Sequence, residues 1–241
     1  MAGQFNTDLS RLHVIVPVRG SAVGKSRLGE ALDSEERLAL VVGLLVRTLE
    51  VLDAWTPSLR THVVTPDVTM RTVVRRFAQR AAAVIEAGSG GLNQALAYAR
   101  DAAVRAGATA IVYLPADLPL LSVEALDGLL EAGDAALAAG SGRPVVVLAP
   151  ADARIGTNAL LLAPPDIIDP QFGEQSLEAH IRAAVAADAS VQLVHDAALG
   201  FDLDMPTDLE RLDIATFLEL QRTGQDALDT TSGRASQAEV A

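Results

Sequence analysis

The stretch ATAIVYLPADLP (residues 108–119) is an apolar run that ends at two prolines on either side of Asp117. An apolar run of this length, bounded by turn residues, is typical of a buried strand. In open α/β sheets, ligands bind outside the carboxyl ends of the strands, so Asp117 stands where a metal or ribose ligand belongs. An aspartate after a strand is often only a turn former or a helix cap. Because Ser122 is better placed to cap the following helix, Asp117 is a candidate ligand residue.

Apolar runs of strand length alternate with longer amphipathic stretches on both sides of this strand. We expect strands at residues 12–18, 61–65, 82–87, 108–119, 144–150, 158–164 and 191–196. We expect helices at residues 34–54, with Ser34 as N-cap, and at 69–80, 92–105, 122–132, 176–188 and 206–220. This alternation is typical of βαβ units and predicts a mainly parallel sheet.

The chain has no internal repeat and no low-complexity linker that would divide it. We therefore predict one domain over residues 11–221, with a Rossmann-like, three-layer α/β fold and a mostly parallel central sheet. From Arg222 onward the periodic apolar residues are lost, so residues 222–241 are expected to form a disordered tail.

The composition excludes several classes of protein. Half of the 241 residues are hydrophobic, and the formal net charge of −12 gives no general attraction to nucleic acid or to anionic lipid. The absence of cysteine excludes disulfides and thiolate metal sites, which fits a reducing compartment. The N-terminal MAGQFNTDLSR has no apolar run, and no segment approaches the length of a membrane span. We expect a cytoplasmic protein without nucleic acid or membrane partners.

The loop after the first strand contains three cationic residues. Lys25 is the only lysine among 19 cationic residues, and Arg19 and Arg27 lie beside it. The run from Gly20 to Ser26 resembles a P-loop, but three residues instead of four separate its glycines, and Arg19 stands where the first glycine belongs. Such a loop can still surround phosphates with backbone N–H groups and charged side chains, the alternative being an ordinary surface loop.

The segment FDLDMPTDL (201–209) carries a pair of aspartates. Asp202 and Asp204 point to the same side of an extended chain, and Pro206 then starts a helix. Two such carboxylates repel each other unless a cation lies between them. An acidic helix cap that includes Asp208 is the alternative interpretation. Together with Asp117, the pair predicts a Mg²⁺ site.

The order of these motifs resembles that of the MobA-like nucleotidyltransferases and, within them, the CofC/FbiD family of guanylyltransferases in the biosynthesis of the deazaflavin coenzyme F-420. The matching segments are VIVPVRGSAVGKSRL (14–28), GGLNQAL (90–96), LPADLPLL (114–121), GTNALLL (156–162), FGEQSLEAH (172–180) and GFDLDMPTDL (200–209). The resemblance covers residues 14–209 and implies a fold of the nucleotide-diphospho-sugar transferase type.

The resemblance also implies an activity, the transfer of GMP from GTP to a phosphorylated three-carbon acid with release of pyrophosphate. The acid is phosphoenolpyruvate in actinobacterial members, 2-phospho-L-lactate in archaeal members and 3-phosphoglycerate in some relatives. The Arg- and Ala-rich composition suggests a GC-rich genome and favours phosphoenolpyruvate. A homodimer and an interaction with the downstream deazaflavin-transferring enzyme remain open.

The same resemblance implies roles for individual residues. Thr157, Gly173 and Ser176 would hold the acceptor acid, which agrees with the stabilisation of anions at a helix N-terminus. A plain N-cap at Ser176 and a plain turn at Gly173 are the alternatives. The nucleotide would be bound by Arg19, Gly20 and Lys25 at its phosphates and by Gly90, Gly91, Leu92 and Asn93 at guanine.

The implied catalytic residues are Lys25, Arg27 and Asp117. Lys25 and Arg27 would neutralise the triphosphate, and Asp117, Asp202 and Asp204 would hold Mg²⁺. The acceptor is already an anion, so no general base is needed, and the histidines (His13, His62, His180 and His195) are scattered and unpaired.

Two other classes of function compete with this interpretation. A P-loop-like NTPase would use Lys25 and Asp117, but the loop spacing and the segment 201–209 speak against it. Release of pyrophosphate instead of orthophosphate would distinguish the two. A catalytically silent nucleotide-binding module is disfavoured because all three candidate metal carboxylates are present.

Overall fold

The computed structural model describes residues 8–20, 25–79, 82–85, 90–140, 142–152 and 156–238, so parts of the predicted loops 19–29 and 88–91 lie outside the described residues. The strands are β1 (Leu12–Pro17), β2 (Ser58–Val64), β3 (Ala82–Ile85), β4 (Ala110–Tyr113), β5 (Val145–Pro150), β6 (Thr157–Ala163) and β7 (Ser190–Leu193). The helices are η1 (Ser26–Glu30), α1 (Ser34–Ala54), α2 (Val68–Phe77), α3 (Leu92–Arg105), α4 (Val123–Ala139), α5 (Ser176–Ala186), α6 (Ala197–Gly200), α7 (Pro206–Arg211) and α8 (Ile214–Ala238). Among the helices of the described residues, none is long and apolar enough to cross a membrane.

The strands form one seven-stranded sheet in the order β3-β2-β1-β4-β6-β5-β7. Its pairs are parallel except that β6 runs antiparallel to both β4 and β5. Only residues 151–156 separate β5 from β6, which is too short for the crossover that parallel neighbours need. The predicted mostly parallel α/β sheet is confirmed.

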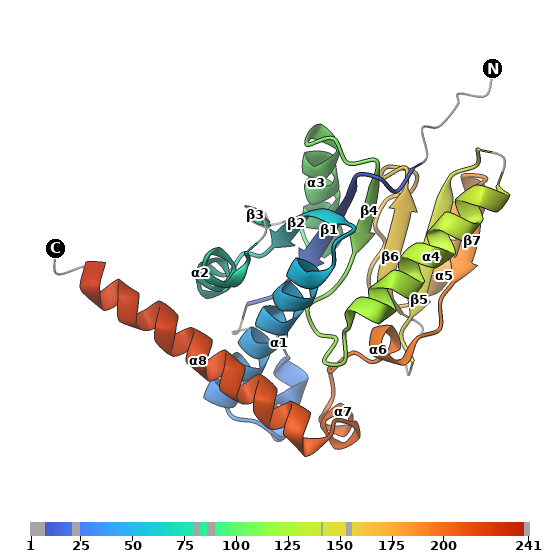
Figure 1. Ribbon diagram of the computed structural model, residues 1–241. Helices are drawn as coiled ribbons and strands as arrows, with labels where there is room; N and C mark the ends of the chain where they lie inside the picture. The colour runs from blue at the N-terminus through green and yellow to red at the C-terminus, as the bar shows by residue number, and fades with distance from the viewer. Residues whose placement is uncertain are drawn as a thin grey trace.

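Helices cover both faces of the sheet (Figure 1), and the burial of alternate strand residues explains why. In β1, Val14 and Val16 pack into the core beneath α1, α2 and α4, whereas Ile15 packs into the core on the side of α3 and α5. In β4, Val112 likewise packs into the core beneath α1, α2 and α4, and Tyr113 packs into the core on the side of α3 and α5. Successive strand residues point to opposite faces, so both faces need a helical layer. The predicted three-layer architecture is confirmed.

The chain crosses the sheet in opposite directions on the two sides of β1. From β1 it passes to β2 and β3 on one side, and β4 then lies on the other side of β1. The carboxyl ends of the parallel strands β1 and β4 are therefore neighbours at a topological switch point, where open α/β sheets bind ligands.

Two helix caps test the sequence predictions. The Oγ atom of Ser122 accepts a hydrogen bond from the backbone N–H of Ala125 at the start of α4, as predicted. For α1 the prediction was wrong by one residue, because Asp33 is the N-cap and forms a capping box with Glu36, while Ser34 is already helical. Since Ser122 caps α4, Asp117 is available for another role.

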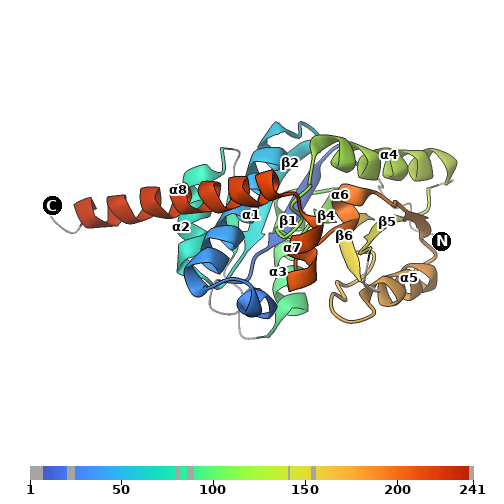
Figure 2. The same cartoon turned by 90° about the horizontal axis from the view of Figure 1, so that it is seen from below.

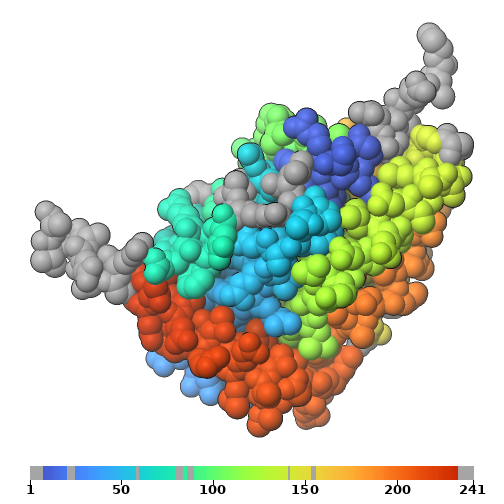
Figure 3. Space-filling model, in the orientation of Figure 1, coloured from blue at the N-terminus to red at the C-terminus, as the bar shows by residue number. Residues whose placement is uncertain are grey.

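The C-terminal part of the chain differs from the prediction. The expected helix 206–220 is interrupted between Arg211 and Ile214, and helix α8 continues to Ala238 through most of the residues expected to form a disordered tail. Helix α8 crosses α1 and projects beyond the sheet (Figures 1 and 2), and the space-filling view shows it lying along the surface of α1 (Figure 3). Its buried residues include Ala227, which packs into the main core.

Close packing of small residues explains why the apolar pattern of α8 is faint. A Cβ atom on Gly43 of α1 would lie 2.0 Å from the carbonyl oxygen of Leu220, and one on Gly224 would lie 1.8 Å from that of Ala39. The two helices approach closely at these glycines. Beside them Leu220 is buried with Leu40 and Leu44 of α1, whereas after Arg222 the contacts with the core are made by Ala227 and Leu228.

We predict that Gly224→Ala lowers the stability of the protein. Alanine favours a helix over glycine, so a loss must come from the clash with Ala39, at a cost of about 1–3 kcal/mol. This corresponds to several degrees in Tm for a chain of this size. The control is Gly128→Ala in α4, where no described atom outside the local helix backbone and the chain neighbours lies within 4 Å of the added Cβ, and stability should be unchanged or higher. Thermal unfolding followed by circular dichroism measures both, and equal Tm values would contradict the prediction.

Two of the histidines expected to be unpaired lie together in the sheet. His13 of β1 and His62 of β2 are buried, and His13 Nδ1 lies 3.0 Å from His62 Nε2. Burial, with smaller contributions from His13 and Arg60, lowers the pKa of His62 to about 4. The pair arises from the parallel register of β1 and β2, which the sequence alone does not specify.

Candidate active site

A cavity of about 780 Å³ lies beyond the carboxyl ends of β1 and β4. Many of the predicted site residues line it, although they come from distant parts of the chain. They are Arg19, Lys25, Arg27, Leu92, Asp117, Thr157, Gly173, Ser176, Asp202 and Asp204. The structure therefore brings the cationic loop, the candidate carboxylates and the predicted acceptor residues to one place.

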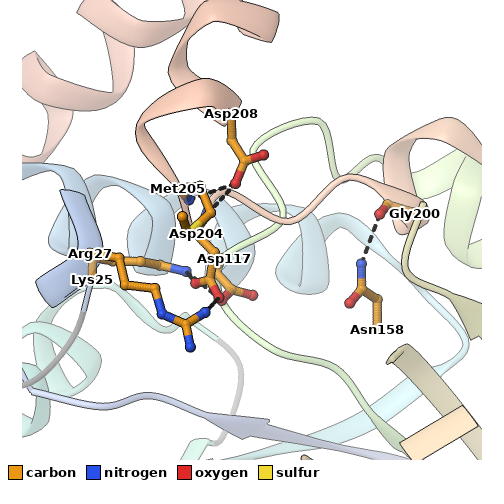
Figure 4. A network of polar contacts seen from close by, with 8 residues as sticks. All are labelled: Lys25, Arg27, Asp117, Asn158, Gly200, Asp204, Met205 and Asp208. Carbon is orange, nitrogen blue, oxygen red and sulfur yellow. Dashed lines mark hydrogen bonds and ion pairs between the residues drawn. The ribbon is translucent and has the colours of Figure 1, made fainter. Parts of the chain in front are cut away.

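Lys25 lies at the centre of the charged wall of this cavity. Its ammonium donates hydrogen bonds of 2.6 Å to Asp117 Oδ2 and of 2.6 Å to Asp204 Oδ1 (Figure 4). Burial lowers the pKa of Lys25, but the two carboxylates outweigh this effect and raise it. The lysine is therefore a fixed, protonated cation between two carboxylates that are far apart in the sequence.

The two arginines of the loop are more exposed than Lys25. The guanidinium of Arg27 lies 3.9 Å from Asp204 Oδ2, and the Arg27 side chain is 66% exposed. An exposed ion pair of this length contributes little to stability. Arg19 is exposed as well and lines the same cavity. Both side chains are accessible to an anionic ligand.

Asp208 positions the segment that carries Asp204. Its Oδ2 atom accepts hydrogen bonds from the backbone N–H groups of Asp204 (2.8 Å) and Met205 (2.6 Å), and the residue is buried. The backbone N–H of Leu203 also donates to the carbonyl of Asp117, at 3.0 Å. The interpretation of Asp208 as part of a helix cap is correct, and this cap also holds Asp204 beside Asp117.

Asn158 is a site residue that the sequence analysis did not select. Its Nδ2 atom donates to the carbonyl oxygens of Leu199 (2.9 Å) and Gly200 (3.0 Å), which fixes the chain just before Asp202 (Figure 4). Asn158 follows Thr157 in the GTN motif, and this motif is the sequence signal that could have identified Asn158 as a site residue.

The predicted acceptor residues lie side by side. The Ser176 Oγ atom accepts a hydrogen bond of 2.9 Å from the backbone N–H of Thr157, which joins the start of β6 to the start of α5. The alternative interpretation of Ser176 as the N-cap is wrong, because Gln175 occupies that position with a φ of 57°. Gly173, with a φ of 136°, makes the turn that precedes it, a backbone conformation that favours glycine.

The predicted guanine residues are only partly in the cavity. Leu92 lines it, whereas Gly90, Gly91 and Asn93 are outside its described wall. Gly20, which is predicted to bind the phosphates, is also outside it. The Asn93 side chain is instead paired with the backbone of Phe172, whose N–H donates to Oδ1 at 2.8 Å and whose carbonyl accepts from Nδ2 at 3.0 Å. Because these contacts occupy its amide, Asn93 ties α3 to the loop that carries Gly173.

The predicted metal ligands fit a divalent cation only in part. Within the described residues, no group of three histidine, aspartate or glutamate side chains is arranged to hold a metal ion. However, Asp117 Oδ1 is buried and has no hydrogen-bond partner among the described residues, so it is an acceptor still available to a cation. Mg²⁺ in nucleotide sites commonly takes one or two carboxylates and completes its shell with phosphates and water. The residues present fit a magnesium ion that is held jointly with a nucleotide.

Comparisons with known proteins identify a family that matches most of this chain. Residues 12–216 match the model of the family described as "Guanylyl transferase CofC like". A phosphoenolpyruvate guanylyltransferase from Rubrobacter xylanophilus is 39% identical over 199 residues, which are 83% of this chain and 92% of the relative. A 3-phospho-D-glycerate guanylyltransferase from Colwellia psychrerythraea is 30% identical over 204 residues, or 84% of this chain and 91% of the relative.

Solved structures confirm the type of fold. A protein from Desulfovibrio desulfuricans, assigned as a nucleotide-diphospho-sugar transferase, superposes with a TM-score of 0.65 at 15% identity, covering 92% of this chain and 98% of that one. A 4-diphosphocytidyl-2C-methyl-D-erythritol synthase from Anaerococcus prevotii gives a TM-score of 0.56 at 11% identity, covering 89% and 98%. At these identities the likeness concerns the fold alone.

Proposed function

The chain belongs to the CofC-like guanylyl transferase family, and on this premise we propose that it transfers GMP from GTP to phosphoenolpyruvate and releases pyrophosphate. Relatives from Rubrobacter xylanophilus and Sphaerobacter thermophilus, 39% and 35% identical, are named phosphoenolpyruvate guanylyltransferases. One observation carries the proposal. A single cavity has the Lys25 ammonium on one wall and the neutral hydroxyls of Thr157 and Ser176 on another.

The charged wall suits the nucleotide. We assign Lys25, Arg19 and Arg27, with the backbone of Gly20, to the triphosphate, because they offer cations in a protein whose net charge is −12. Leu92 would contact the guanine, with the backbone of Gly90 and Gly91 nearby. Asn93 would act indirectly, by holding Phe172.

A bound Mg²⁺ would be held by Asp117 and Asp204, with Asp202 beside them, and would supply charge neutralisation at the phosphates. The Lys25 ammonium now bridges two of these carboxylates. The same ammonium would also contact the phosphates of a bound nucleotide, beside the carboxylates that hold it in place.

The hydroxyl wall suits the acceptor. A phosphate oxygen of the acid attacks the α-phosphorus of GTP, a new phosphorus–oxygen bond forms, and the bond from the α-phosphorus to the bridging oxygen breaks as pyrophosphate leaves. The nucleophile is already an anion, so the residues need to position the reactants and neutralise charge. Thr157, Gly173 and Ser176 would orient the acid, while Lys25 and Arg27 would stabilise the departing pyrophosphate.

An assay with three acceptors tests the proposal. The protein is incubated with GTP, Mg²⁺ and either phosphoenolpyruvate, 2-phospho-L-lactate or 3-phosphoglycerate, and pyrophosphate release is measured. We expect the highest kcat/KM with phosphoenolpyruvate. A higher value with 3-phosphoglycerate would match the Colwellia relative instead. Release of orthophosphate without any acid would overturn the proposal in favour of an NTPase.

The remaining assignments follow from this activity. We propose that residues 11–221 form one catalytic domain, that the enzyme works in the cytoplasm, and that its product enters coenzyme F-420 biosynthesis through a deazaflavin-transferring enzyme. Helix α8 starts inside this domain and packs along α1, so it extends the domain at its C-terminal end.

We predict that Ser176→Ala raises the acceptor KM by about tenfold and leaves the GTP KM within twofold, because a hydrogen bond to a charged group is lost. The change also leaves the buried Thr157 N–H without its acceptor, so stability falls by about 1–3 kcal/mol. The control is Ser122→Ala, which removes the N-cap of α4 at a cost of about 1 kcal/mol and should not alter KM. An unchanged acceptor KM in Ser176→Ala would refute the assignment of Ser176.

A further inference from the structure

A chain of hydrogen bonds runs from the protein backbone through a buried histidine to the acceptor wall. The backbone N–H of Gln171 donates to His180 Nε2 at 2.9 Å. The other ring nitrogen, His180 Nδ1, lies 3.0 Å from Thr157 Oγ1. The ring of His180 is fully buried, and Thr157 lies between it and the cavity.

These contacts determine which nitrogen of His180 carries the proton. The N–H of Gln171 can only donate, so Nε2 must offer a lone pair. Burial lowers the pKa of His180 to about 4, so the ring is neutral near pH 7 and its single proton is on Nδ1. His180 therefore donates to the hydroxyl oxygen of Thr157 and does not accept from it.

The direction of this hydrogen bond determines what Thr157 offers to a ligand. Its oxygen already accepts from His180, and because Thr157 lines the cavity, its own proton can be donated to a ligand there. The hydroxyl oxygen of Ser176 likewise accepts a hydrogen bond, in this case from the backbone N–H of Thr157. Both hydroxyls are thus set to donate, which suits a ligand group that only accepts, such as a carboxylate or phosphate oxygen.

The surroundings keep the ring in one orientation. His180 lies one helical turn after Ser176 on α5, so both side chains face Thr157. Phe172 packs edge-on against the His180 ring at 5.0 Å between centroids, and it packs in the same way against Tyr113 at 5.7 Å. The imidazole is therefore confined by aromatic contacts as well as by hydrogen bonds.

We propose that His180 is a positioning residue that holds the Thr157 hydroxyl as a hydrogen-bond donor to an anionic oxygen of the acceptor acid. The identity of the acceptor rests on the proposed function, whereas the orientation of Thr157 does not. His180 acts through Thr157 and takes no part in proton transfer during the reaction.

A double-mutant cycle tests this role. His180→Phe keeps an aromatic ring but removes both nitrogens, and we expect the acceptor KM to rise about tenfold with a GTP KM within twofold. Thr157→Val should raise the acceptor KM similarly. The double variant should resemble Thr157→Val alone, because His180 then has no hydroxyl to orient. His180→Asn, which retains an N–H donor near the position of Nδ1, should restore part of the lost affinity.

The outcomes separate positioning from a purely structural role. If His180 only supports the core, His180→Phe will raise KM by the same factor with and without the Thr157 hydroxyl, and the proposal is overturned. A second measurement needs no substrate, namely ¹⁵N NMR of the histidine side chains in the wild-type protein. We expect the signal that disappears in His180→Phe to report a neutral ring protonated at Nδ1, and protonation at Nε2 would also overturn the proposal. If the wild-type protein transfers GMP to none of the acids, the proposed function fails, while the NMR result still decides the orientation of Thr157.

Discussion

Asp117→Asn is expected to lower the rate of GMP transfer by roughly a hundredfold or more in a protein that remains folded. Asp117 follows β4. One of its carboxylate oxygens accepts from Lys25, and the other is buried with no partner in the part of the chain that the structure describes. Asparagine has nearly the same shape but removes the negative charge and replaces one acceptor by a donor. It therefore weakens the hold on Lys25 and on any cation that is bound with the nucleotide.

A second aspartate provides the control for this variant. Asp127 lies on α4, and its Oδ1 accepts a hydrogen bond of 2.8 Å from the indole N–H of Trp55. Asp127→Asn retains that oxygen and should leave kcat unchanged. Pyrophosphate release gives the rate, and circular dichroism with thermal unfolding shows whether each variant is folded. A well-folded Asp117→Asn with a rate close to that of the wild type would disprove the role of Asp117.

The fold was largely predictable because buried strands and amphipathic helices leave strong patterns in the sequence. The run around Val112 and the alternation along the chain predict the sheet and its two helical layers. The antiparallel direction of β6 follows from the short connection 151–156, which has no room for a parallel crossover. The continuation of α8 beyond residue 220 was missed because part of its contact with α1 is made by Gly224 and Ala227, which carry little apolar signal.

The candidate site was predictable where residues follow strands, and less so where residues act through the backbone of another segment. Lys25 and Asp117 come after β1 and β4, which are neighbours in the sheet, so their proximity follows from the topology. Asn158, Asp208 and His180 hold backbone groups or other side chains in place. The sequence indicates a helix cap at Asp208, but it does not show that this cap positions Asp204, nor which groups Asn158 and His180 contact. Asn93 is the opposite case. Its amide is expected to recognise a base, but in the structure it forms hydrogen bonds with the backbone of Phe172.

Lys25→Met is expected to lower kcat/KM for GTP by roughly a hundredfold while the acceptor KM stays within twofold. Methionine keeps the length of the side chain but leaves Asp117 and Asp204 without the ammonium that both contact at 2.6 Å. Two nearby carboxylates without a cation repel each other and the triphosphate. Arg27→Ala is the comparison, because its guanidinium is mostly exposed and its ion pair is long, so we expect only a several-fold loss.

The backbone of Lys25 makes a further variant necessary. Lys25 has a φ of 57°, in the left-handed region that glycine adopts without strain and that other residues adopt at a cost. Lys25→Gly therefore removes the ammonium and relieves the backbone, whereas Lys25→Met removes the ammonium alone. A similar loss of GTP use in both variants would assign the effect to the missing charge. A loss in Lys25→Met that Lys25→Gly restores, or an equal loss for GTP and the acceptor, would instead show that the loop is distorted, and Lys25 would not be the residue that binds the triphosphate.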